Sequence, residues 1–129
     1  MDTFLWILQW LLFAVFLLAG GVKGLLPPER LLAIEQMGWI TDTGIFRARM
    51  AGYAEIVGAF GLIIPGLTAL PAYFVPVAAL GLATIMGMAA VTVHRPRNEP
   101  IVTNAVLGGL ALVVAIGRLI EPVTRPTPT

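Results

Sequence analysis

A few side chains that can move protons or hold a polar ligand lie within long apolar stretches of this sequence. Glu55 is the only charged residue between Met50 and Val93. A carboxylate and an imidazole can exchange protons with a bound molecule, which makes Glu55 and His94 candidate acid/base catalytic residues. Ammonium, guanidinium and amide groups can hold the polar head of a ligand. The candidate ligand-binding residues are Lys23, Arg49, Asn104, Arg118 and Gln9.

The composition indicates a membrane protein. The chain has 129 residues, of which 58% are hydrophobic and 12% charged, whereas soluble domains have about 25% charged residues. The net charge of +1 and the absence of a basic, aromatic-rich patch give no reason to expect a nucleic-acid partner. The chain has no cysteine, which excludes disulfides and thiolate metal sites. No cofactor or metal motif is evident, so we expect neither a cofactor nor a metal site.

The apolar stretches predict an all-α integral membrane protein, a single domain over residues 1–129 that forms a bundle of four transmembrane helices. A spanning helix needs about 20 mostly apolar residues. The first stretch lacks the basic start of a signal peptide, so we expect it to be retained. Prolines 65 and 71 divide the long central stretch. The expected helices are 4–22, 48–64, 72–94 and 101–120.

The first loop and the distribution of basic residues bear on how the chain lies in the membrane. Residues 28–38 could form a helix on the membrane surface, with Trp39 at headgroup level, or an ordinary irregular loop. The loops after the first and third helices share one side. They hold most of the basic residues, namely Lys23, Arg30, Arg47, Arg49, Arg95 and Arg97. The positive-inside rule places these loops in the cytoplasm and the termini outside.

Each expected helix has a face that is rich in small residues or ends in a polar one, which is typical of packed membrane helices. A spacing of three and four residues puts Gly52, Glu55 and Ala59 together on the second helix. On the third helix we expect Gly87 and His94 to face the bundle and Leu82 to face lipid. The remaining polar members are Gln9 and Lys23 on the first helix, and Asn104 and Arg118 on the fourth.

The polar residues on these faces fall at two depths. Lys23, Glu55, His94 and Asn104 lie toward the cytoplasmic side, with Glu55 about 10 Å along its helix. They could therefore converge in one polar pocket, with Gln9 and Arg118 forming a second layer near the opposite face. Other interpretations stay open. Glu55 could form a structural ion pair with Lys23 or Arg49. Lys23 and Arg118 could extend to headgroups, His94 could lie at the interface, and Asn104 could bridge helices.

Several segments resemble those of the DoxX-like family of small bacterial membrane proteins. They are "GGVKGL" (20–25), "RMAGYAEIVGAFGLIIP" (49–65) and "PVAALGLATIMGMAAVTVHR" (76–95), together with an Asn near the start and an Arg near the end of the fourth helix. The resemblance implies a four-helix bundle in the bacterial inner membrane. It also implies association with quinone-linked redox complexes, since some relatives are linked to a thiosulfate:quinone oxidoreductase. The family's recurring polar positions look like Lys23, Glu55, His94, Asn104 and Arg118.

Three functions fit these observations. The first is a membrane subunit that binds a small lipophilic, quinone-like molecule, in a redox complex or a homo-oligomer. The second is an intramembrane acid/base enzyme of the isomerase or epoxide-opening type, with Lys23 or Arg49 stabilising negative charge. The third is a proton or ion pathway, which the apolar middle of the bundle disfavours. The sequence leaves open whether the protein is an enzyme.

Overall fold

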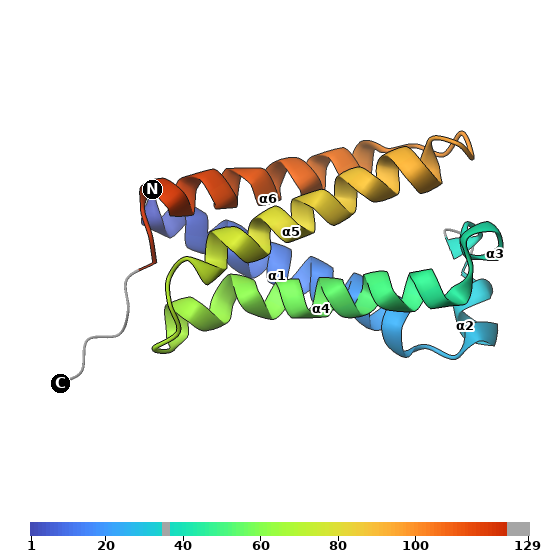
Figure 1. Cartoon of the computed structure of the whole chain (residues 1–129), viewed down its shortest axis with the longest axis horizontal. Helices are drawn as coiled ribbons and strands as arrows, with labels where there is room; N and C mark the ends of the chain where they lie inside the picture. The colour runs from blue at the N-terminus through green and yellow to red at the C-terminus, as the bar shows by residue number, and fades with distance from the viewer. Residues whose placement is uncertain (35–36, 124–129) are drawn as a thin grey trace.

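The structure, a computed structural model, describes residues 1–34 and 37–123. Within these residues, four long helices run along the molecule and alternate in direction (Figure 1). They are α1 (Asp2–Leu25), α4 (Ile45–Leu67), α5 (Phe74–Ala89) with its π-helical continuation η2 (Ala90–His94), and α6 (Val102–Ile120). Each is long and apolar enough to cross a membrane. The predicted all-α, four-helix membrane bundle is therefore confirmed, and the chain is a multi-pass membrane protein.

In the described part of the connection between α1 and α4 lie two short α-helices. Leu26 takes an extended conformation because it precedes a proline, and this ends α1. Helix α2 (Pro28–Leu32) then begins with proline at its first position, where the missing N–H costs nothing. Helix α3 (Ile40–Thr43) follows Trp39. The helix predicted over 28–38 thus ends at Leu32 in the structure, and residues 35–36 of that range lie outside the described residues.

Helix α4 extends beyond the predicted end at residue 64. It begins after Gly44, whose φ of 98° suits a residue without a side chain. It then continues through Pro65, which is buried inside the helix, to Leu67. The helix was expected to end at residue 64 because the next residue, Pro65, lacks an N–H group. Membrane helices tolerate proline because neighbouring groups satisfy the freed backbone.

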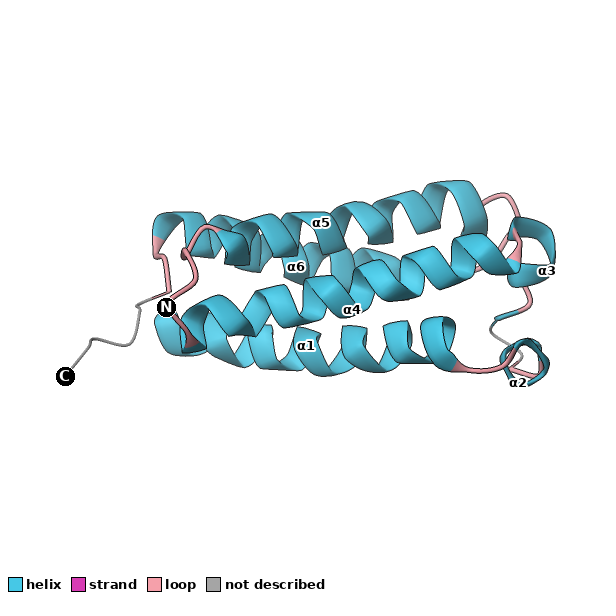
Figure 2. Cartoon of the chain, turned by 60° about the horizontal axis from the view of Figure 1, so that its bottom comes forward, coloured by secondary structure: helices cyan, strands magenta, loops and turns pink. Residues whose placement is uncertain are grey.

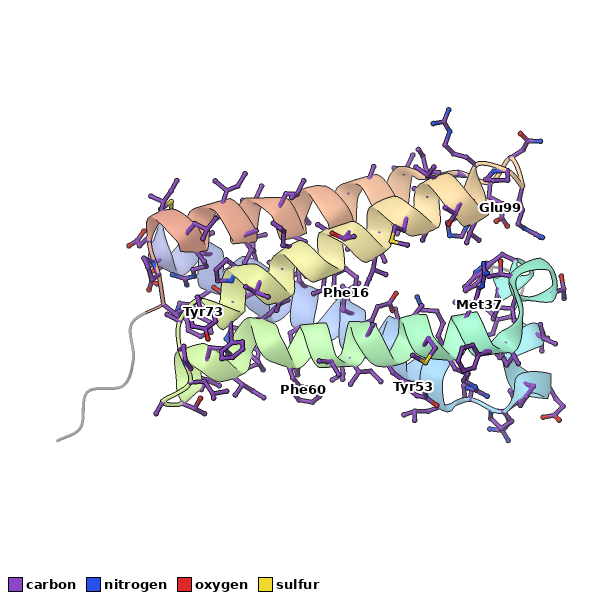
Figure 3. All side chains as sticks on the ribbon, in the orientation of Figure 1. Phe16, Met37, Tyr53, Phe60, Tyr73 and Glu99 are labelled. Carbon is purple, nitrogen blue, oxygen red and sulfur yellow. The ribbon has the colours of Figure 1, made fainter. Side chains whose placement is uncertain are left out.

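The bundle consists of two closely packed helix pairs, α1 with α4 and α5 with α6 (Figure 2). Side chains such as Leu12, Phe16, Leu62 and Val114 fill the core between the pairs, and Phe16 is labelled there in Figure 3. The N-terminus, the end of α6 and the α4–α5 turn lie at one end of the bundle, and helices α2 and α3 lie at the other (Figure 1). This arrangement matches the one expected for four spans.

The expected inward face of α5 was wrong. The buried residues of α5 and η2 are Val75, Pro76, Ala79, Leu82, Met86 and Ala90. Gly87 is exposed, and a side chain there would meet nothing within 4 Å. Leu82, expected to face lipid, packs instead on Gly58 of α4. Two helices can pack closely when only one of them has small residues at the contact. Here α4 supplies them, because Gly58 faces Leu82 and Gly61 faces Ala78 of α5.

Candidate functional site

The close crossing of α1 and α4 creates the site. A Cβ atom built on Gly20 would lie 2.6 Å from the carbonyl oxygen of Gly52. One built on Gly52 would lie 2.7 Å from the backbone nitrogen of Gly24. Real Cβ atoms do not make such short contacts with a backbone, so these positions require glycine. The two helices therefore touch through their backbones just where Lys23 and Glu55 face each other.

Lys23 and Glu55 form a buried ion pair across this crossing. The Lys23 ammonium donates a hydrogen bond to Oε1 of Glu55. The side chain of Glu55 is only 1% exposed, whereas that of Lys23 is 12% exposed. Taking a carboxylate out of water costs several kcal/mol, and one ion pair with good geometry offsets only part of this cost. The remaining polar atoms of Glu55 therefore matter for its role.

The second carboxylate oxygen of Glu55 lacks a partner within the described part of the chain. Oε2 is buried and accepts no hydrogen bond there. A carboxylate oxygen can accept two hydrogen bonds, and leaving a buried one unpaired costs about 1–3 kcal/mol or more. Glu55 thus presents an unused acceptor inside the bundle.

Arg49 also stabilises the crossing of α1 and α4, through a hydrogen bond to α1 and not through an ion pair with Glu55. Its Nη1 donates to the backbone carbonyl of Lys23 at 3.1 Å. That carbonyl lies in the last turn of α1, where a cation is favourable because carbonyls there lack helical partners. Arg49 therefore helps to fix the end of α1 and, through it, the position of Lys23.

His94 contacts a different carboxylate from the one expected. Its Nδ1 lies 3.0 Å from Oε1 of Glu99, which also accepts a hydrogen bond from Nε of Arg97 at 3.2 Å. The His94 ring meets Trp39 edge to face, with 6.2 Å between centroids. No contact between His94 and Glu55 is found in the described chain. The structure thus joins His94 to the loop after η2, labelled at Glu99 in Figure 3.

Asn104 also lies apart from the ion pair. Its Nδ2 approaches Sδ of Met86 at 3.9 Å, a contact between α6 and α5. Sulfur is a weak acceptor, so this contact leaves most of the hydrogen-bonding capacity of the amide unused. Of the four residues expected in one pocket, the structure brings together Lys23 and Glu55.

Gln9 and Arg118 form the predicted second polar layer at the opposite end of the bundle. Nε of Arg118 donates to Oε1 of Gln9 at 2.6 Å, and Nε2 of Gln9 donates to the Leu62 carbonyl at 2.5 Å. Arg118 also pairs with Asp2 at 2.8 Å and lies over the ring of Trp6. Its side chain is buried, and Nη2 has no hydrogen-bond partner among the described residues. The layer joins α1, α4 and α6.

A cleft of about 510 Å³ opens at the end of the bundle that holds α3. One wall is formed by Thr43 and Arg47, at the junction of α3 and α4. The other is formed by η2 and the loop after it, and its residues are Thr92, Val93, Pro96 and Arg97. Arg47 lies about 12 Å before Glu55 on α4, at 1.5 Å per residue. The cleft and the ion pair are thus on the same half of the bundle.

Comparison with known proteins identifies the family. Residues 7–118 match the sequence profile described as the DoxX-like family. The chain belongs to the DoxX-like family. Among curated proteins and solved structures, no significant match is found. The resemblance of individual segments is therefore confirmed over nearly the whole chain. The family match itself assigns no role to any residue.

One pattern in the sequence of this DoxX-like chain, not used in the predictions above, indicates the close crossing of α1 and α4. Gly20 and Gly24 are four residues apart and face the same partner helix, which is the small-xxx-small pattern of tightly crossing membrane helices. Recognising the pattern would have predicted that α1 packs most closely on α4. It would also have favoured Lys23, one residue before Gly24, as the partner of Glu55.

The loop after η2 gives the DoxX-like chain a testable pH dependence. The hydrogen bond from His94, helped by the charge of Arg97, lowers the pKa of Glu99 below its ordinary value of 4.5. A lowered pKa in the folded state means that this contact stabilises the loop above pH 4.5 and stops doing so as the pH falls through the lowered value. In an NMR titration, the Glu99 carboxyl should have a midpoint below 4.5. The midpoint should rise in His94→Ala, and an unchanged midpoint would show that the two groups do not interact.

Proposed function

We propose that this protein binds a small lipophilic, quinone-like molecule whose polar head reaches Glu55 inside the bundle. The observation that supports this most is a fully buried carboxylate whose Oε2 has no hydrogen-bond partner among the described residues. Ionisable groups inside membrane proteins are rare and costly, and they usually mark a ligand or ion pathway. Lys23 neutralises the charge of Glu55, and the free oxygen is left for a ligand.

A purely structural role for Glu55 would leave this oxygen unexplained. Replacing a buried ion pair by well-packed apolar residues is often neutral or stabilising, so stability alone is a weak reason to keep one. Leu, Ile and Ala would also pack at a helix crossing without any desolvation cost. A ligand that donates to or bridges the carboxylate accounts for both the charge and its incomplete pairing.

The cleft beside Arg47 offers an entrance from the same end of the bundle. It is open, and polar groups line its mouth. A lipophilic molecule could enter there between α4 and η2 and place its head about two helical turns deeper. Arg118 and Gln9, at the other end, would not contact a short ligand whose head is at Glu55, and they join the helices there.

The alternative hypothesis was an intramembrane acid/base enzyme that uses Glu55 and His94 together. General acid–base catalysis needs both groups within hydrogen-bond reach of the same substrate. His94 bonds to Glu99 in this structure, and Glu55 bonds to Lys23. This geometry favours binding over proton transfer between those two residues. Any redox chemistry would then belong to a partner subunit.

The proposed location is the bacterial inner membrane, with α2, α3 and the loop after η2 in the cytoplasm. The excess of basic residues at this end supports the orientation. The chain has no cysteine, so single cysteines can be labelled cleanly. In intact cells, an impermeant maleimide should label Leu70→Cys and should label Arg95→Cys only after the membrane is ruptured. The reverse pattern would invert the topology.

Glu55→Gln tests the proposed function. The variant keeps the size of the side chain but removes its charge, so it should lose most of its affinity for a decyl-quinol analogue, whose hydroxyl groups can donate to the carboxylate, by about tenfold or more in nanodiscs. Glu29→Gln is the matched control, because Glu29 is an exposed carboxylate of α2 at the same end. It should bind as the parent does. Normal binding by a destabilised Glu55→Gln protein would show that Glu55 is only structural.

A further inference from the structure

The chemistry around Glu55 restricts the kind of head group that fits there. We infer, on the basis of the proposed function, that the ligand presents an O–H donor to Oε2 of Glu55, as a phenol, a quinol or an alcohol does. A molecule whose head has only carbonyl or ether oxygens would bind much more weakly. Oε1 of Glu55 already accepts a hydrogen bond from Lys23, and Oε2 accepts none from the described residues.

The ion pair makes Glu55 an acceptor. Burial disfavours the ionised carboxylate, whereas the charge and the hydrogen bond of the Lys23 ammonium at Oε1 favour it, and the inferred ligand is the one that fits the ionised pair. An ionised carboxylate has four lone-pair positions and no proton to donate. The free Oε2 can therefore be satisfied only by a donor. A carbonyl oxygen placed there would face another electron-rich oxygen in an apolar surrounding, which is unfavourable.

Within the described part of the chain, no group donates a hydrogen bond to Oε2. At the crossing itself, a Cβ built on Gly20 would meet the carbonyl oxygen of Gly52 and carbon atoms of Ile56 and Glu55, and none of these atoms is a donor. The Lys23 ammonium has two further N–H groups, but its side chain is 12% exposed and can reach water or headgroups. Oε2 of Glu55, unlike the Lys23 ammonium, is buried from solvent. The unmet need at this site is thus for a donor to Oε2.

The opposite end of the bundle has the reverse requirement. There the buried polar atom without a partner, among the described residues, is the Nη2 donor of Arg118. A guanidinium has no acceptor, so an oxygen with lone pairs would suit it and a second donor would not. A head group that has only carbonyl or ether oxygens would therefore be drawn away from Glu55. This contrast makes the location of binding, as well as its strength, informative.

The test compares two probes that differ in one hydrogen-bond donor. Para-dodecylphenol and its methyl ether share the ring and the tail, but only the phenol has an O–H group. Binding of each is measured in nanodiscs by displacement of a fluorescent lipophilic reporter. The parent protein should bind the phenol at least about tenfold more tightly than the ether, because a hydrogen bond to a charged group is worth at least that much. In Glu55→Gln the difference should largely disappear, because an amide both donates and accepts.

The outcomes separate this inference from the proposed function. Equal binding of both probes by the parent, with both weakened by Glu55→Gln, would overturn the donor requirement and leave the site at Glu55. Tighter binding of the ether would mean that Oε2 carries a proton, and this too would overturn the inference. Binding of neither probe, or binding unaffected by Glu55→Gln, would overturn the proposed function itself. The comparison on the parent protein stands even if the variant folds poorly.

Discussion

Gly52→Leu is expected to destroy the tight crossing of α1 and α4 and to destabilise the protein by about 3 kcal/mol or more. A Cβ at this position would lie 2.7 Å and 2.8 Å from backbone atoms of Gly24 and Gly20. Backbone atoms inside a packed bundle cannot move aside as a flexible side chain can, so the helices must separate. The separation would also pull Lys23 away from Glu55. The free energy of unfolding in mixed micelles, followed by circular dichroism, measures the loss.

Gly87→Leu is the matched control for this prediction. It makes the same chemical change in another membrane helix, at an exposed glycine where a side chain meets nothing within 4 Å. We expect its free energy of unfolding to stay within about 0.5 kcal/mol of the parent. If Gly87→Leu destabilised as strongly as Gly52→Leu, the arrangement of helices described above would be wrong.

Lys23→Met is expected to cost about 3–5 kcal/mol, because it leaves the Glu55 carboxylate buried without its counter-charge. Methionine keeps much of the length of lysine, so the change in packing is small. The double variant Lys23→Met with Glu55→Met should recover much of this loss, since apolar residues of similar size often replace a buried ion pair without cost. Unfolding free energies of the parent, the two single variants and the double variant complete the cycle.

The coupling energy between the two substitutions shows whether Lys23 and Glu55 interact. If the ion pair is formed as described, the loss in the double variant should be clearly smaller than the sum of the two single losses. Additive losses would mean that Lys23 and Glu55 do not interact, and the crossing would then have to be described differently. Binding of the lipophilic probe should be lost in the double variant whatever its stability.

The sequence predicted the inward faces of α1, α4 and α6 because polar residues mark them. Gln9, Glu55 and Arg118 are too costly to expose to lipid, so each identifies the buried face of its helix. Helix α5 has no such residue between Phe74 and Ala89, and small residues alone suggested the wrong face. Its packing depends on how Leu82 fits against Gly58 of the neighbouring helix, which is a property of two helices together.

The candidate site was predicted in part for a related reason. Lys23 and Glu55 lie at the same depth on faces that meet, so the sequence put them in one expected pocket and kept an ion pair as an alternative, and the structure shows the ion pair. His94 is the last residue of a π-helical turn, which changes the direction in which a side chain leaves the helix, and a periodicity of 3.6 residues cannot anticipate this. Its partner, Glu99, lies in a loop, and no helical spacing relates the two residues.

The most direct test of the central claim is to locate the bound ligand. A lipophilic probe with a photoreactive group beside a phenol head is irradiated with the protein in nanodiscs, and the labelled residues are mapped by mass spectrometry. The methoxy form of the probe is used in parallel. We predict labelling around residues 20–23 of α1 and 52–56 of α4, competed by unlabelled ligand and lost in Glu55→Gln. Labelling confined to lipid-facing residues or to the Gln9–Arg118 layer, and unchanged in Glu55→Gln, would contradict a ligand site at Glu55.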